Sequence, residues 1–186
     1  MARDVCGRMD WPALFHRMHP GFFESAQVRG LPEQGVWEEM ALDLRRFSPD
    51  ALTIAVPEHI TFGRYRGGIG PLRELVRRVD PGWPEIYRPG DSVYCAFDGE
   101  RIASFCLLEE MGTYDGVRIG GPGCVGTLPE YRRRGIGLKM VQNATALLRE
   151  AGCDLGYIHF TGVAGWYARL GYRTVLRWSK AGILGE

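Results

Sequence analysis

The stretch from Val125 to Ala151 constrains this chain more than any other part of its sequence. It reads as the end of an apolar strand, then a basic turn that contains glycines, and then a long amphipathic segment. The apolar residues of that segment recur at helical spacing, at Ile136, Met140, Ala144, Leu147, Leu148 and Ala151. We therefore predict a helix that begins near Gly135 and stops at Gly152, because a glycine there favours termination.

Three arginines stand immediately before this predicted helix, at Arg132, Arg133 and Arg134. The first turn of a helix has unpaired N–H groups and a partial positive charge, which suit a phosphate or diphosphate. Gly135 and Gly137 let a ligand approach the backbone, since no Cβ stands in the way. The turn is neither a Walker P-loop, since no Gly-Lys-Ser/Thr follows, nor a Rossmann turn. We interpret it as a cradle for a nucleotide-type diphosphate, with a solvated basic loop as the alternative.

Composition narrows the class of protein. At 186 residues the chain suits one compact domain, or one domain with an extension. A formal net charge of +1 argues against a general nucleic-acid binder. No apolar run is long enough for a membrane span, and the first residues lack the apolar core of a signal peptide. The five scattered cysteines predict reduced thiols and a cytoplasmic protein.

The first part of the chain, residues 1–57, is predicted to be a mostly helical N-terminal extension docked on a domain of residues 58–186. Helices are expected at Pro12–His19 and at Val36–Arg46, where apolar residues share one side. His16 and His19 lie three residues apart, but no cysteine or acidic cluster accompanies them. No metal site is therefore expected.

The remaining residues alternate between strand and helix patterns. Asp98-Gly99 and Asp115-Gly116 predict two hairpins, and Gly120-Gly121-Pro122-Gly123 predicts a bulge in the strand before the basic turn. A helix is expected from Pro71, and a short one over residues 164–170. The predicted strands are Ile60–Tyr65, Val93–Phe97, Ile102–Glu109, Val117–Ile119, Cys124–Thr127, Leu155–Phe160 and Tyr172–Trp178.

This order of elements, with the motif Arg132-x-x-Gly135-x-Gly137, closely resembles the GNAT superfamily of acyl-CoA-dependent N-acetyltransferases. A second motif, Gly165 to Tyr172, is similar to the family's aromatic-Tyr-x-x-x-Gly-aromatic segment. The resemblance covers roughly residues 58–180. It implies an α/β (α+β) GNAT fold, in which helices flank a mixed central sheet with a splayed fourth strand. It also implies acetyl-CoA as co-substrate.

The resemblance further implies which residues bind acetyl-CoA. The splayed strand would offer backbone groups of Val125, Gly126 and Thr127 to the pantetheine arm, and the glycine-proline cluster before it gives a physical cause for the splaying. The turn amides would hold the diphosphate, and these belong to Arg132, Arg133, Arg134, Gly135, Ile136, Gly137 and Leu138.

Tyr167 is the implied general acid, since it lies four residues before Gly171, as in the family's motif. It would protonate the departing CoA thiolate. Glu109 or Glu110, at the end of a predicted central strand, is the candidate general base. His159, the terminal carboxylate at Glu186 and ordered water are the alternatives. One departure from the commoner pattern is Phe160, which stands where many members have an asparagine.

The predicted function is transfer of an acetyl group from acetyl-CoA to a primary amine, by direct attack in a ternary complex. The alternative is a non-catalytic CoA-binding sensor or structural module. The expected partner is a small-molecule or peptide amine, with no nucleic acid and no membrane. The chain is expected to be a monomer or a homodimer.

Overall fold

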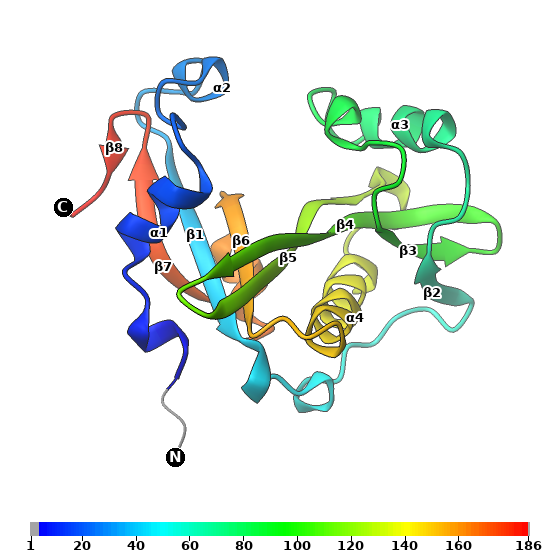
Figure 1. Cartoon of the computed structure of the whole chain (residues 1–186). Coiled ribbons are helices and arrows are strands. Elements are labelled where there is room, and N and C mark those ends of the chain that lie inside the picture. Colours follow the sequence, from blue (N-terminus) through cyan, green and yellow to red (C-terminus); the bar gives the residue numbers. More distant parts are fainter. Residues whose placement is uncertain (1–3, 186) are drawn as a thin grey trace. The chain divides into compact units, whose positions relative to one another are not determined.

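The structure is a computed structural model that describes residues 4–185 (Figure 1). The strands are β1 (Val36–Asp43), β2 (Ile60–Arg64), β3 (Val93–Asp98), β4 (Arg101–Tyr114), β5 (Val117–Thr127), β6 (Leu155–Thr161), β7 (Arg173–Ser179) and β8 (Gly182–Ile183). The helices are α1 (Trp11–Met18), α2 (Ala26–Arg29), α3 (Ile69–Arg77), α4 (Ile136–Glu150) and α5 (Ala164–Ala168). None of these helices is long and apolar enough to cross a bilayer.

The strands are hydrogen-bonded in the order β2-β3-β4-β5-β6-β1-β7-β8. The sheet is mixed, because β5 pairs with β6 in parallel whereas β1 runs antiparallel to both β6 and β7. The chain divides into two compact units, and β4 and β5 run through both. The first unit comprises the residues up to Phe47, Met111–Gly120, and the residues from Gly152 onward, and the second comprises Ser48–Glu110 and Gly121–Ala151. These units divide the chain at positions other than residue 57, so the separate extension and domain remain a prediction.

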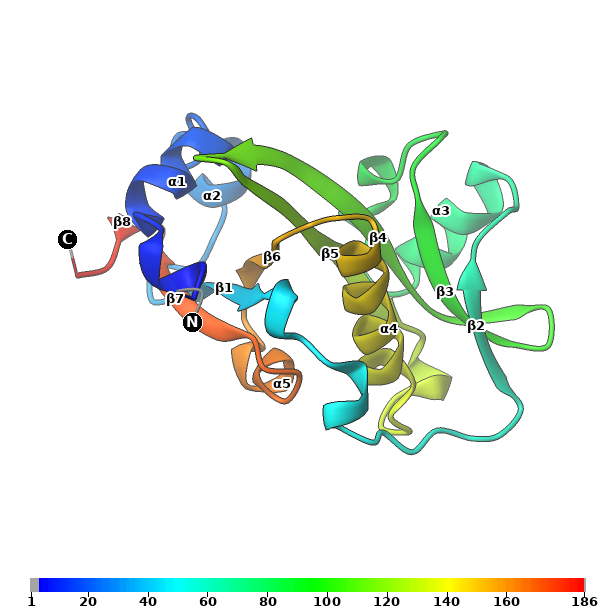
Figure 2. The same ribbon diagram turned by 60° about the horizontal axis from the view of Figure 1, so that its bottom comes forward.

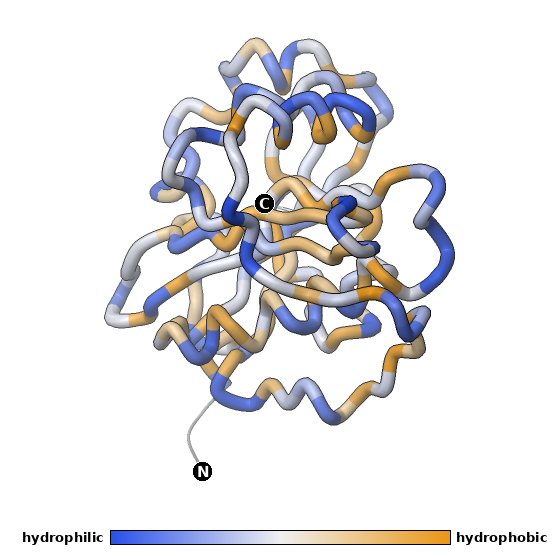
Figure 3. Tube along the Cα trace, turned by 90° about the vertical axis from the view of Figure 1, so that its right-hand side faces the viewer, coloured by the Kyte–Doolittle hydropathy of each residue, from blue (hydrophilic) through white to orange (hydrophobic). Residues whose placement is uncertain are grey.

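In the second unit, α3 and α4 cover opposite faces of β3 and β4 (Figures 1 and 2). Residues of β3 alternate between the faces, as strand geometry requires. Val93 and Cys95 pack with Leu72 and Val76 of α3, while Ala96 packs with Ile136 of α4. In the hydropathy view of Figure 3, hydrophobic and hydrophilic residues alternate along much of the trace.

In the first unit, the segment predicted as a helix over Val36–Arg46 is strand β1, followed by the short 3-10 turn Leu44–Arg46. The helix prediction was wrong for a physical reason. β1 has a hydrogen-bonded neighbour on each edge, and Met40 and Ala41 are both buried. A strand buried on both faces carries adjacent apolar residues, and a short apolar run fits helical and strand periodicity equally well.

The other helix of this part of the chain agrees with the prediction. α1 begins after Asp10, whose carboxylate accepts a hydrogen bond from the Ala13 N–H at 3.1 Å as an N-cap. Leu14 packs with Ala41 and Tyr157, and Phe15 packs with Trp178. α1 thereby covers part of a buried core to which β1 contributes.

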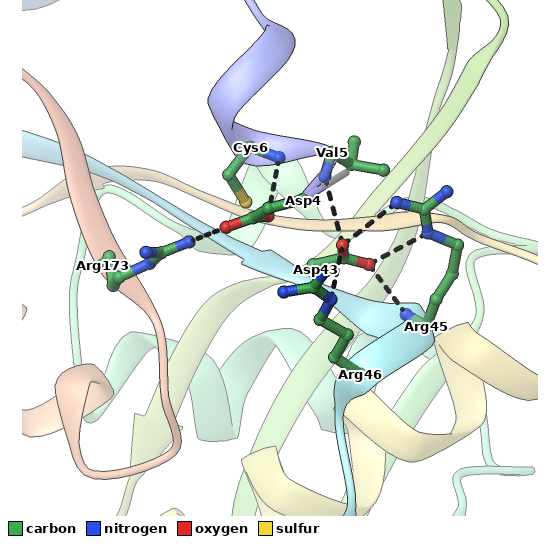
Figure 4. A network of polar contacts seen from close by, with 7 residues as sticks. All are labelled: Asp4, Val5, Cys6, Asp43, Arg45, Arg46 and Arg173. Atoms are coloured by element: carbon green, nitrogen blue, oxygen red, sulfur yellow. Dashed lines mark hydrogen bonds and ion pairs between the residues drawn. The ribbon is translucent and has the colours of Figure 1, made fainter. Parts of the chain in front are cut away.

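Asp43, at the end of β1, is the centre of a polar network that holds the chain's N-terminal segment (Figure 4). Its side chain is buried and accepts hydrogen bonds from the Val5 N–H at 3.1 Å and from Arg45 Nη2 at 3.0 Å. Arg46 Nε approaches within 3.8 Å. A second ion pair, Arg173 with Asp4, lies beside it. Burial raises the pKa of Asp43. The hydrogen bonds from Arg45 and from the Val5 N–H together lower this pKa by more, so the net shift is downward.

We expect Asp43→Asn to lower the free energy of unfolding at pH 7 by about 1–3 kcal/mol, because it removes a charged hydrogen-bond acceptor. The loss stays in this range because Arg45 is partly exposed and solvent already weakens its ion pair with Asp43. A carboxyl whose pKa is lower in the folded state stabilises the fold above its unfolded pKa. That contribution disappears as the pH falls through the folded pKa. Thermal unfolding should therefore show the wild type and variant converging below about pH 4. Asp10→Asn is the control, since asparagine also caps a helix, and a gap that persists at pH 2 would contradict the assignment.

Candidate functional site

The basic turn between β5 and α4 lies within the second unit and has the backbone of an anion site. Arg133 and Gly135 adopt left-handed φ angles of 62° and 76°, and α4 begins at Ile136 directly after them. Left-handed residues in such a turn direct successive N–H groups into one concavity. No acidic residue lies in the first turn of α4, and the three arginines are exposed. The turn combines oriented amides, the positive end of a helix and positive side chains.

Gly135 is required here by its φ angle and by the space around it. A Cβ at this position would lie 2.3 Å from the Ala55 carbonyl oxygen and 3.3 Å from Ile54 Cγ2. The segment containing Ala55 is fixed against α4 by Gln142, whose Nε2 donates to the carbonyls of Pro49 at 2.9 Å and Leu52 at 2.7 Å (Figure 2). Residues 49–55 therefore form a wall of the turn that sequence reasoning missed, because nothing in the sequence pairs a buried glutamine with distant carbonyls.

Strand β5 leads into this turn and is irregular at Cys124, one residue after the cluster in which a bulge was predicted. It runs without interruption from Val117 to Thr127, and Cys124 has a φ of 45°. A left-handed non-glycine residue inside a strand marks a local irregularity of the backbone. The Tyr87 hydroxyl donates to the Cys124 carbonyl at 2.7 Å and fixes the irregular residue.

The end of β5, at Val125, Gly126 and Thr127, is held by side chains of the same unit. Ser104 Oγ is completely buried and donates to the Gly126 carbonyl at 2.7 Å, and Arg132 Nε donates to the Thr127 carbonyl at 3.0 Å. Two of the backbone carbonyls that the family resemblance implied for pantetheine therefore already accept hydrogen bonds. Arg132 shapes the turn as well as adding positive charge. Ser104 was not predicted, since a lone serine in a strand gives no signal.

The two candidate bases have different surroundings at the end of β4. Glu109 is partly buried, and its carboxylate occupies the space beside Gly123, where an added Cβ would lie 2.0 Å from Oε2. Glu110 is exposed on the opposite face of the strand. The structure thus places the Glu109 carboxylate against β5 at Gly123, which lies two residues before Val125. Burial, followed by the nearby Glu109 charge, raises the pKa of Cys124 to about 12, so this thiol stays protonated at neutral pH.

Tyr167 belongs to the first unit, where it lies on α5 and is 7% exposed. Its ring makes edge contacts with Trp166, at a centroid distance of 4.8 Å, and with Tyr172, at 6.1 Å. Gly171, four residues later, has a φ of 93° that favours glycine. The ten predicted cofactor residues and both glutamates lie together in the second unit, and Tyr167 does not belong to that set.

Two of the alternative bases are residues of the chain, His159 and Glu186. His159 lies on β6 in the first unit, with its Nδ1 2.9 Å from the Glu39 carboxylate. Phe160, at the position where the family resemblance implied an asparagine, has a left-handed φ of 56°. Burial, followed by the His159 charge, lowers the pKa of the neighbouring His19 to about 4. Glu186 lies outside the described residues.

Comparison with known proteins bears on the class of domain and on the fold. Residues 89–174 match the sequence model described as an acetyltransferase (GNAT) domain. A solved glucosamine N-acetyltransferase region of a fungal multi-domain β-N-acetylglucosaminidase is 24% identical, with a TM-score of 0.64 over 78% of this chain and 20% of that one. A GCN5-related N-acetyltransferase from Sphaerobacter thermophilus is 19% identical, with a TM-score of 0.58 over 81% of this chain and 52% of that one. A third, from Kribbella flavida, is 21% identical, with a TM-score of 0.53, 83% coverage of this chain and 60% of its own.

Residues 89–174 thus match a GNAT domain model, and the solved structures confirm the predicted GNAT fold. The chain spans between a fifth and three fifths of the length of the three solved proteins. No curated protein sequence matches it. Acetyl transfer is the general chemistry that a GNAT domain supports.

Proposed function

We propose that this protein is an acetyl-CoA-dependent N-acetyltransferase that transfers the acetyl group to a primary amine by direct attack in a ternary complex. The observation that carries the proposal is the left-handed turn before α4, where the Cβ of any other residue at Gly135 would meet the Ala55 carbonyl. A left-handed turn of this kind, which only glycine fits at position 135 and which exposed arginines line, is suited to a diphosphate.

The residues of the second unit fit acetyl-CoA in the following way. Amides from Arg132 to Leu138 would bind the diphosphate, with the arginine side chains adding charge. Backbone N–H groups near Val125 would meet the pantetheine arm, since Ser104 and Arg132 engage two neighbouring carbonyls. Acetyl-CoA would supply the activated thioester carbonyl that the amine attacks.

The acid–base roles follow from the same proposal. A protonated alkylamine must lose a proton before it attacks, and the tetrahedral intermediate then expels the CoA thiolate. Glu109 is the proposed base, since its carboxylate lies against β5 and is partly shielded from water. Tyr167 is the proposed acid that protonates the departing sulfur. The products are an N-acetylated amine and free CoA.

We expect Glu109→Gln to lower kcat/KM at pH 7 about fivefold, because ordered water can replace part of the proton acceptor's role. Glu110→Gln is the matched control, as the neighbouring carboxylate is exposed. Steady-state release of CoA thiol measures both variants. Equal losses in the two would remove Glu109 from the mechanism.

The proposed function is tested by release of CoA thiol with a panel of amines. The panel contains a polyamine, a lysine peptide, free amino acids and glucosamine, the last because one similar solved protein is a glucosamine N-acetyltransferase region. Amine-dependent release supports the enzyme. Acetyl-CoA binding by calorimetry with no turnover on any amine would favour the alternative, a CoA-binding sensor or structural module.

A further inference from the structure

Three metal-binding side chains converge in the first unit from distant parts of the sequence. His19 follows the last residue of α1, Glu39 belongs to β1, and His159 belongs to β6. One ligand atom from each lies within 4.8 Å of those from the other two. Among the described residues, this is the one group of three or more such side chains that could hold a metal ion.

Glu39 is completely buried and held in place by several donors. Its Oε1 accepts hydrogen bonds from Trp178 Nε1 at 2.7 Å and from the Phe160 N–H at 3.1 Å. Its Oε2 lies 2.9 Å from His159 Nδ1. The pairing of β1 with β6 shifts register between Glu38 and Met40, so Glu39 itself lies at the irregularity. A carboxylate oriented by outer hydrogen bonds in this way is typical of metal sites.

His19 supplies a nitrogen that has no other role in the described structure. Its Nε2 is buried and has no hydrogen-bond partner there. A buried polar atom without a partner is destabilising, and native structures usually satisfy such an atom with protein, water or an ion. The His19 ring lies 3.8 Å from the His159 ring, centroid to centroid, at an interplanar angle of 15°. The residue that carries the unsatisfied nitrogen therefore belongs to the same cluster as the Glu39 carboxylate.

Aromatic rings surround the two imidazoles and limit the access of water. The ring centroid of His19 lies 5.2 Å from that of Phe15 and 5.9 Å from that of Phe22. The ring centroids of Phe22 and His159 are 5.2 Å apart. The His159 side chain retains 25% exposure, which leaves a route for a small ion. An apolar shell around nitrogen and carboxylate ligands strengthens their attraction to a cation.

We propose that His19, Glu39 and His159 bind a divalent transition-metal ion of the zinc class. Two imidazoles and one carboxylate suit Zn²⁺, whereas Ca²⁺ and Mg²⁺ prefer sites built from oxygen alone. The ion would join α1, β1 and β6, and this role is independent of the proposed acetyl transfer.

The test uses the full chain, treated with a chelator and then titrated with Zn²⁺ in a calorimeter. We expect one ion per chain and an increase in Tm of about 5–10 °C when Zn²⁺ is at a hundredfold excess over its Kd. Co²⁺ should give visible d–d absorption bands of a site with nitrogen ligands. His19→Gln should weaken Zn²⁺ binding at least tenfold. His16→Gln, an exposed histidine on the same helix, should leave it unchanged.

Each outcome decides the proposal. Stoichiometric binding that is lost in His19→Gln and retained in His16→Gln supports the site. Equal Zn²⁺ affinity in both variants, or no binding to the wild type at micromolar Zn²⁺, overturns it. If His19→Gln fails to fold, the Co²⁺ spectrum of the wild type decides alone, because absent bands at saturating Co²⁺ exclude coordination by the imidazoles.

Discussion

Gly135→Ala is expected to raise the Kd for acetyl-CoA by roughly 10–100-fold. A non-glycine residue at a φ of 76° carries strain of about 1–3 kcal/mol, and each 1.4 kcal/mol corresponds to about a factor of ten in affinity. The added Cβ would also lie 2.3 Å from the Ala55 carbonyl oxygen, so either the turn or the segment 49–55 must move. Isothermal titration with acetyl-CoA measures the affinity, and thermal unfolding measures the strain.

Gly70→Ala is the control for this experiment. Gly70 lies in the first turn of α3, and an added Cβ there would meet nothing within 4 Å. Alanine has the higher helix propensity, so this variant should unfold at the same or a slightly higher temperature and bind normally. If Gly135→Ala binds acetyl-CoA as tightly as Gly70→Ala does, the turn is not the diphosphate site.

Tyr167→Phe is expected to lower kcat at least tenfold and to leave the affinity for acetyl-CoA nearly unchanged. The phenol would protonate the CoA thiolate as it leaves, whereas phenylalanine keeps the ring and its edge contacts with Trp166 and Tyr172. The phenol and thiol have ordinary pKa values near 10 and 8.5, so the transfer is mismatched by only about 2 kcal/mol. Single-turnover kinetics with saturating amine measure the chemical step.

The variant must be separated from a merely structural one, because Tyr167 is buried. Tyr114→Phe removes a hydroxyl from the same unit without touching α5. It should keep full activity. A fall in Tm without a change in kcat for Tyr167→Phe would make the residue part of the core instead of the reaction.

Local sequence predicted those elements whose residues need few distant partners. Asp115 and Gly116 have φ angles of 52° and 76°, as the predicted tight hairpin turn requires. The span of α4 follows from apolar spacing and from the glycines at its ends. The same reasoning gave a wrong prediction for Val36–Asp43, because the spacing of its apolar residues fits a helix and a buried strand equally well. Its two hydrogen-bonded neighbours, β6 and β7, decide the outcome.

The sequence by itself determined the glycine-bearing basic turn that we propose for the diphosphate, because Gly135 and its neighbouring arginines act through local backbone geometry and charge. The distinction between Glu109 and Glu110 needed the structure, since only one of them occupies the space beside Gly123. Tertiary structure also decided the cluster of His19, Glu39 and His159. Side chains separated by 20 and 120 positions become neighbours there only because β1 pairs with β6 and α1 packs beside them. The spacing of these residues along the chain cannot predict that they are neighbours in space, because their proximity depends on which strands pair through hydrogen bonds.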